Sequence, residues 1–287
     1  MFIAIYPSIG EKRGGVNAPK QSQGLKVNPR SQNKAIRTES FWRINVPHPV
    51  WHKKTNCLII EIMLRPSPII QGEYYHILGR GNNKENIFIN DRDYIRFLFL
   101  ILYFQSPTSF ENISRIVDAY IKQGRFAINP DTVNEILRKR FVNLIGFALM
   151  PNHYHLIVYE RKAGGISRYM QRILNSSTKY FNLKYERVGH LFQGPYKSVH
   201  VEDNDQLLHL SSYLHLNPKD LNKWRSKEIE YPWSSFQDYA HKNRWGRLLA
   251  TDIIMNQFDD GKEYEEFTLT SGAKNLLDEI EEDSKIF

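Results

Sequence analysis

The sequence predicts an α+β fold built on an antiparallel sheet. Two observations predict it: short segments rich in aromatic and branched residues, and amphipathic stretches that separate them. Along the chain the order is strand, helix, hairpin of two strands, helix, strand and a further helix. That order is typical of a ferredoxin-like (RRM-like) split βαβ unit, with the helices packed on one face of the sheet.

The first half of this unit is well patterned. A strand covers Glu73–Gly79 and runs into a polar turn that starts at Arg80. A helix follows from Asp91 to Tyr103. The central hairpin consists of Phe141–Leu149 and His153–Tyr159, joined by a tight turn. Between helix and hairpin, residues 106–140 read as an insertion of two amphipathic helices, the second capped by an asparagine before an early proline.

The second half repeats the alternation. A long amphipathic helix covers Gly165–Asn182, and a strand covers Tyr196–Glu202. The next helix covers Gln206–Leu216, is capped by Asp203 or Asp205, and is stopped by the proline that follows.

Composition sets broad limits on the class of protein. The 287 residues hold a single cysteine, Cys57, which excludes an internal disulfide and a cysteine-based zinc site and fits a reducing cytoplasm. No apolar run is long enough for a transmembrane helix, and Pro7 interrupts the start too early for a signal peptide. The net charge is +8, with +7 in residues 1–62, +9 in 63–250 and −8 in 251–287. A basic body with an acidic tail suits a polyanionic partner such as nucleic acid.

Composition and patterning divide the chain into three regions. Residues 1–66 are basic, lack apolar periodicity and are expected to be disordered; they are a basic arm for DNA or an upstream extension of a chain that starts at Met63. Residues 67–220 are expected to form the main domain with its insertion, and they contain the segments that are candidates for catalysis. Residues 221–287 form a helical extension with an acidic tail.

The hairpin carries the first functional signal. His153 and His155 open its second strand, and residues two apart point to the same face of a strand. Two adjacent imidazoles form half of a metal site, although a half-buried strand that carries two histidines gives the same pattern. Sixty residues later, Tyr213 and Asn217 are four apart and share one helical face, whereas His215 lies on another. An amide oxygen is a hard ligand and a tyrosine hydroxyl is a nucleophile, but a core tyrosine and a helix-end asparagine would look the same.

Together these segments resemble the single-tyrosine HUH transposases, in particular the REP-associated group related to the single-stranded-DNA insertion-sequence transposases. The resemblance covers about Glu73 to Ser235 and includes the turn at Arg80, the motif around His153 and the segment from Tyr213 to Pro218. Asn217 stands where many relatives have glutamine, and the 108–140 insertion and the amino-terminal extension are further departures.

The resemblance implies a metal-dependent tyrosine DNA transposase that cleaves and rejoins single-stranded hairpin DNA through a 5′-phosphotyrosine. Tyr213 would be the nucleophile, and His153, His155 and Asn217 would hold Mg²⁺ or Mn²⁺, with no small-molecule cofactor. The protein would be cytoplasmic and nucleoid-associated, without a membrane partner, and a homodimer is compatible with the family. Phosphate contacts are expected from basic residues of the loops and helices: Arg80, Lys84, Arg168, Arg172, Lys179 and Lys197.

Other interpretations stay open at this point. Tyr169, Tyr180 and Tyr185 are alternative nucleophiles or stacking residues, although packing is the simpler role for each. A domesticated or non-catalytic protein with the same fold could bind single strands without chemistry. A metal-dependent phosphohydrolase is a third interpretation, disfavoured by the scarcity of carboxylates near the histidine pair.

Overall fold

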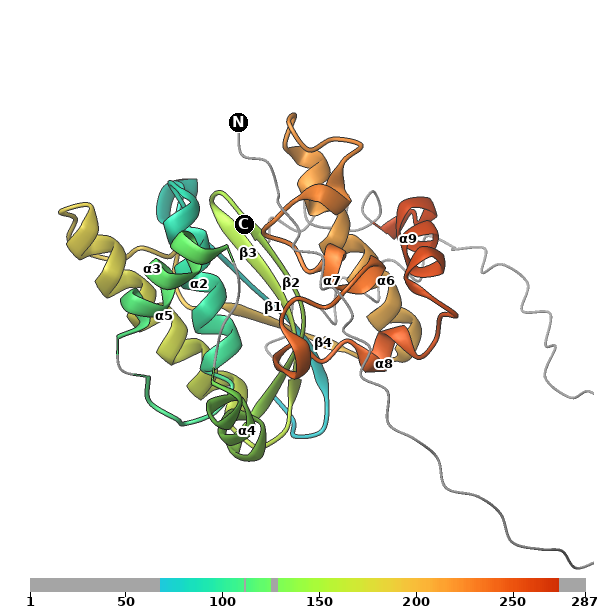
Figure 1. Cartoon of the computed structure of the whole chain (residues 1–287), viewed down its shortest axis with the longest axis horizontal. Helices are drawn as coiled ribbons and strands as arrows, with labels where there is room; N and C mark the ends of the chain where they lie inside the picture. The colour runs from blue at the N-terminus through green and yellow to red at the C-terminus, as the bar shows by residue number, and fades with distance from the viewer. Residues whose placement is uncertain (1–67, 111, 125–128, 274–287) are drawn as a thin grey trace, which may run out of the picture. The chain divides into compact units, whose positions relative to one another are not determined.

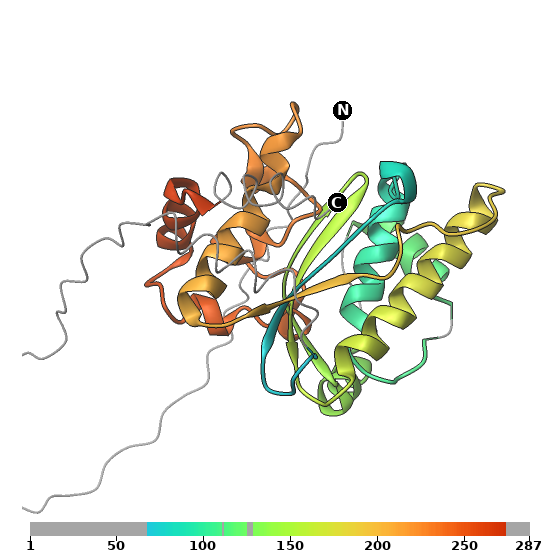
Figure 2. The same cartoon turned by 180° about the vertical axis from the view of Figure 1, so that it is seen from behind.

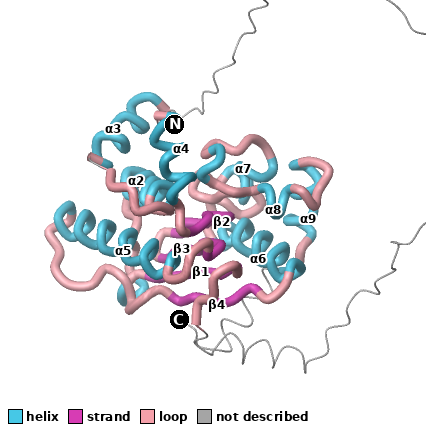
Figure 3. The backbone as a smooth tube through the Cα atoms, turned by 90° about the horizontal axis from the view of Figure 1, so that it is seen from below, coloured by secondary structure: helices cyan, strands magenta, loops and turns pink. Residues whose placement is uncertain are grey.

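A single antiparallel sheet lies at the centre of the structure, a computed structural model that describes residues 68–110, 112–124 and 129–273. Its strands stand in the spatial order β2-β3-β1-β4, and every neighbouring pair is antiparallel (Figure 3). They are β1 (Tyr74–Arg80), β2 (Val142–Met150), β3 (His153–Glu160) and β4 (Lys197–Val201). With helices between β1 and β2 and between β3 and β4, this is the βαββαβ order of the predicted ferredoxin-like unit. The α+β class is confirmed.

The helices follow the predicted order. They are α2 (Asp91–Tyr103), α3 (Ile113–Gln123), α4 (Pro130–Lys139), α5 (Gly165–Lys184), α6 (Asn204–Leu216), α7 (Phe236–Ala240), α8 (Asp252–Met255) and α9 (Gly261–Thr270). Four 3₁₀ turns accompany them: η1 (Asn82–Lys84), η2 (Asn217–Asp220), η3 (Glu228–Glu230) and η4 (Gly246–Leu248). Thus α3 and α4 are the two helices expected in the insertion.

Local capping explains where several helices begin. The side chain of Asn90 and that of Asp93 form a reciprocal capping box at the start of α2. Asn129 accepts a hydrogen bond from the amide of Asp131 at 2.9 Å and caps α4. Of the two aspartates expected before α6, Asp203 is the cap, because it accepts from the amide of Gln206 at 2.8 Å.

Helices cover both faces of the sheet (Figures 1 and 2). Tyr75 and Ile77 of β1 belong to a core shared with α2 and α5 on one face. Ile157 of β3 and Val201 of β4 belong to a second core shared with α6, α7 and α9. The helices predicted to cover one face are α2 and α5. The second layer forms because the alternate strand positions are also apolar, so that face too must be covered.

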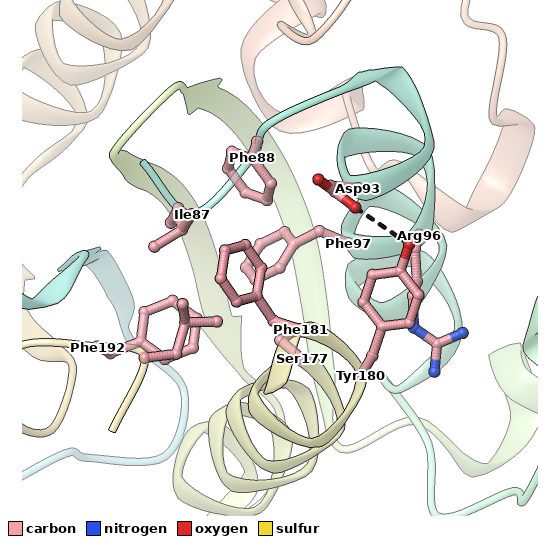
Figure 4. A pocket seen from close by; sticks show the side chains of 10 residues that line it. Ile87, Phe88, Asp93, Arg96, Phe97, Ser177, Tyr180, Phe181 and Phe192 are labelled. Carbon is pink, nitrogen blue, oxygen red and sulfur yellow. Dashed lines mark hydrogen bonds between the residues drawn. The ribbon is translucent and has the colours of Figure 1, made fainter. Parts of the chain in front are cut away.

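A small hollow lies between α2 and α5, on the first of these faces. Figure 4 shows its aromatic walls and, at its rim, Tyr180 donating a hydrogen bond to Asp93 at 3.0 Å. The apolar lining comes from α2, α5 and the loops beside them: Ile87, Phe88, Phe97, Phe181, Leu191 and Phe192. This hollow contains none of the predicted metal ligands or the predicted nucleophile.

Two expectations fall outside the described ranges. The basic extension over 1–66, with Met63, lies there, as does the end of the acidic tail from residue 274 onward. Within the ranges that the structure does describe, no helix combines the length and apolar character needed to cross a bilayer.

Candidate active site

The turn before β3 is fixed by the loop that follows β1. The carbonyl of Asn152 accepts from the amide of Gly81 at 2.8 Å, and the carbonyl of Pro151 accepts from Ile87 at 2.9 Å. The Asn152 side chain donates to the carbonyl of Lys84 at 3.1 Å and contacts His153, with 2.7 Å between Asn152 Oδ1 and His153 Nδ1. The start of β3 therefore has little freedom to move.

Strand alternation separates the three residues of the histidine motif. Tyr154 is fully buried on the α2–α5 face, with its ring 5.2 Å from that of Phe97 and lying over Gly79, where any Cβ would collide with it. His153 and His155 point to the opposite face, with ring centroids 5.0 Å apart. The apolar middle residue thus anchors the motif, and the prediction that both imidazoles share a face is confirmed.

Helix α6 brings Tyr213 to this face. The centroid of its ring lies 5.6 Å from that of His155, with the two planes at 87°. Both side chains are only 1% exposed. Residues about sixty positions apart in the sequence are thereby placed in edge-to-face contact within one chain.

Asn217 follows α6 directly and begins η2. Its side chain is buried, and its Nδ2 donates to the carbonyl of Tyr213 at 3.0 Å. That bond keeps the amide on the same side of the helix as Tyr213, as the spacing of four predicts. Its role as a metal ligand stays a prediction.

A third histidine, His76 of β1, was not among the predicted site residues. Its Nε2 lies 2.9 Å from Nδ1 of His155, and the two rings are stacked with centroids 5.1 Å apart. Its ring also meets that of Tyr213 edge-on at 6.1 Å. Burial lowers the pKa of His76 to about 4, so it is neutral at pH 7. Side chains alternate between the two faces of a strand, so His76 shares a face with His155 only when the β1–β3 register sets an even-numbered residue of β1 opposite His155.

His215 has a structural place, as its helical position suggested. It is fully buried, with Nδ1 2.7 Å from the hydroxyl of Tyr264 in α9 and Nε2 2.8 Å from Oγ of Ser235. Ser235 Oγ also accepts from the amide of Phe147 in β2 at 2.9 Å. Burial lowers the pKa of His215 to about 3. This neutral imidazole ties α6 to α9 and to the sheet.

The six predicted phosphate contacts fall into two groups. Arg80 pairs with His153 across the β1–β3 register, and Lys197 pairs with Leu78, whose other neighbour is His155. Lys84 lies in the loop that fixes the β3 turn. These three therefore lie near the histidine pair on the side of the site.

The other three are on α5, beneath the opposite face of the sheet. Arg168 and Lys179 are exposed. Arg172 donates to the carbonyls of Ser106 and, at 2.8 Å, of Thr108, and its guanidinium lies 4.2 Å from the centre of the Phe104 ring. Arg172 thus anchors the loop after α2. Phosphate contacts by these three residues stay a prediction.

The alternative tyrosines are engaged away from the histidines. Tyr169 donates to the carbonyl of Ile101 at 2.5 Å, while Tyr180 and Tyr185 donate to Asp93 at 3.0 and 2.7 Å. All three lie on α5 or directly after it, on the face opposite to Tyr213. Their packing roles explain them.

The segment that carries this site is similar to a known protein family. The family model described as "Transposase IS200 like" matches residues 129–217. Residues 129–217 therefore resemble the IS200-like transposases. The matched segment contains His153, His155 and Tyr213 and ends on Asn217, so the resemblance to single-tyrosine transposases is confirmed.

The whole chain was also compared with curated proteins and with solved structures. No curated protein matches the chain. A solved structure of "the REP associates tyrosine transposase bound to a REP hairpin" is similar over 69% of this chain and 95% of that chain, with 16% sequence identity and a TM-score of 0.40.

Proposed function

We propose that the protein is a transposase that cleaves and rejoins single strands of hairpin DNA, with Tyr213 as its nucleophile. The observation that carries the proposal is the edge-to-face contact of Tyr213 with His155, 5.6 Å between ring centroids. It brings the predicted nucleophile on α6 against one of the two predicted histidine ligands on β3. The similarity of this segment to the IS200-like family supports the same chemistry.

The side chains at the site fit a divalent cation. In both His153 and His155 it is Nδ1 that makes the hydrogen bond described above, so Nε2 is the nitrogen that would face a cation. Across residues 68–273, leaving aside the few that are not described, no three His, Cys, Asp or Glu side chains gather as a metal site. The remaining ligands would be oxygen atoms of Asn217, the DNA phosphate and water, a set suited to Mg²⁺ or Mn²⁺.

In the cleavage step the Tyr213 hydroxyl oxygen forms a bond to the scissile phosphorus while the bond to the 3′ oxygen breaks. The phenol proton passes to water, and the leaving oxygen takes a proton from water, which leaves a 5′-phosphotyrosine and a free 3′-hydroxyl. A bound cation would polarise a non-bridging phosphate oxygen and stabilise the developing charge. A second 3′-hydroxyl can then reverse the step and join new ends, because the ester conserves the energy of the broken bond.

His76 would act as a positioning residue in this reaction. When the Nε2 of His155 faces a cation, Nδ1 keeps its proton and donates a hydrogen bond to Nε2 of His76, 2.9 Å away. That bond selects one tautomer and one orientation of the His155 ring. Since His155 and Tyr213 are each only 1% exposed, the phosphate can reach them only after the groups that cover them move.

The test compares wild type with Tyr213→Phe on a labelled hairpin oligonucleotide in Mg²⁺ or Mn²⁺. Wild type should give a nick and a covalent protein–DNA adduct, and the variant should give neither. Tyr180→Phe is the matched control: it also removes one tyrosine hydroxyl, from the opposite face of the sheet, and should cleave normally.

Other outcomes would select the competing functions. Equal cleavage by Tyr213→Phe and wild type would refute the nucleophile assignment. Cleavage without any covalent adduct would favour a phosphohydrolase. Binding without cleavage by every protein on every hairpin tried would favour a domesticated or non-catalytic binding protein.

A further inference from the structure

Three arginines gather at the end of the sheet farthest from the β3 turn. Arg140 directly follows α4 before β2 begins, Arg161 directly follows β3, and Arg247 lies in η4. The amide of Arg161 donates to the carbonyl of Phe141 at 3.0 Å, and Nη1 of Arg140 donates to the carbonyl of Arg247 at 3.4 Å. Segments distant in the sequence thus place three guanidinium groups together.

A buried glutamine holds this arrangement in place. Gln105 is fully buried, and its backbone carbonyl accepts a hydrogen bond from the backbone amide of Phe141 at 2.8 Å. Its Oε1 accepts from the amide of Leu144 at 3.0 Å, and its Nε2 donates to the carbonyl of Leu248 at 2.7 Å. The start of β2 and η4 are therefore joined through one side chain, so the arginines stand on a rigid support.

Two acidic side chains that are close in the sequence are engaged elsewhere. Glu160 is buried and accepts from the amides of Gly165 and Ile166 at the start of α5, at 2.9 and 2.6 Å. Glu135 pairs with Lys139 at 2.8 Å. Among the residues described, no carboxylate lies within 4.0 Å of the three guanidinium groups. Their like charges are left uncompensated by the fold itself.

Arg140 carries the clearest sign of an anion-binding role. Its Nε is buried and has no hydrogen-bond partner among the described residues. Burial, and then the charges of Arg161 and Arg247, lower the pKa of Arg140 to about 10, so it stays charged at pH 7. The charges of Arg161 and Arg247, both exposed residues, act on this guanidinium, and guanidinium groups bind phosphate through paired N–H groups.

We propose that Arg140, Arg161 and Arg247 form a second phosphate-binding surface, which holds the DNA backbone away from the cleavage site. The proposal rests on the proposed function for its substrate. His153 and Glu160 are the two ends of β3, seven residue steps apart, so the surface lies about 23 Å from the histidine pair at roughly 3.3 Å per residue. A duplex stem of about seven base pairs, at roughly 3.4 Å each, is needed to span that distance.

The experiment measures hairpin binding by fluorescence anisotropy at several salt concentrations, in the Tyr213→Phe background and without metal, so that no cleavage occurs. The test variant is Arg161→Gln/Arg247→Gln, because both side chains are exposed. The matched control is Arg115→Gln/Lys262→Gln, which removes the same charge from exposed positions on α3 and α9. Hairpin stems of four and ten base pairs are compared.

On the longer stem, the affinity of the test variant should depend less steeply on salt than that of its Tyr213→Phe parent, measured as the slope of log affinity against log salt concentration. The slope should fall by about 0.9 for each phosphate that the variant no longer neutralises, or about 1.8 in all, while the control keeps the parental slope. With the shorter stem, test and control should behave alike. Equal slopes for test and control on the longer stem would overturn the proposal while leaving the proposed function intact. Failure of the parental protein to bind any hairpin would instead refute the function.

Discussion

The stacked pair of His76 and His155 makes a sharp prediction about metal binding. His76→Phe keeps a flat ring in the buried site but removes Nε2 of His76, the atom 2.9 Å from Nδ1 of His155 that would accept its hydrogen bond in the metal-binding tautomer. Leaving a buried donor without a partner costs about 1–3 kcal/mol. Loss of such an outer partner typically weakens metal binding by about 10- to 100-fold. His76→Gln retains an amide oxygen that can accept the same bond.

The assay titrates Mn²⁺ into protein with bound hairpin, in the Tyr213→Phe background, followed by calorimetry or by the paramagnetic signal of free Mn²⁺. His76→Phe should raise the Kd by about 10- to 100-fold, and His76→Gln should restore most of the affinity. Thermal unfolding by circular dichroism verifies that each variant is folded. If His76→Phe binds Mn²⁺ as tightly as its parent, or if both substitutions weaken binding equally, His76 does not orient a metal ligand.

Three further predictions concern the framework. His215→Phe removes one hydrogen-bond partner of the Tyr264 hydroxyl. The variant should fold, and urea denaturation should show a free energy of unfolding lower by about 1–3 kcal/mol. Gln105→Leu should cost about 2–4 kcal/mol in the same assay, since several backbone groups lose their partner; a decrease of less than about 0.5 kcal/mol would contradict the bridging role. Burial alone would raise the pKa of Asp93, but hydrogen bonds from Lys184 and others bring it below its usual value. Its contribution to stability is therefore present above the unfolded pKa of about 3.9 and is lost as pH falls through the lower folded pKa; Asp93→Asn should flatten stability over that acid range, and an unchanged pH profile would refute this.

Much of the fold could be predicted because its signals are local. Short apolar segments on either side of a tight turn marked the hairpin, and the pair Asp203 and Asp205 marked the start of α6, where Asp203 is the cap. The spacing of four between Tyr213 and Asn217 placed both on one side of α6 because helical geometry is fixed by the chain itself.

What could not be predicted depends on how distant segments meet. His76 joins the site only because β1 pairs with β3 in a register that sets Leu78 opposite His155, and no residue in β1 alone specifies that. Arg172 reads as part of a basic helix side, yet its guanidinium is taken up by two carbonyls of a neighbouring loop. The cover on the second face of the sheet likewise arises from the C-terminal helices, whose short segments carry weak periodicity.

The contact between His155 and Tyr213 is made inside one polypeptide, and this has a kinetic consequence. If the proposed cleavage uses this contact, one copy of the chain is enough to cut a strand, and the initial rate of cleavage at low protein concentration should rise with the first power of that concentration. Dilution would then slow the reaction in proportion and would not switch it off.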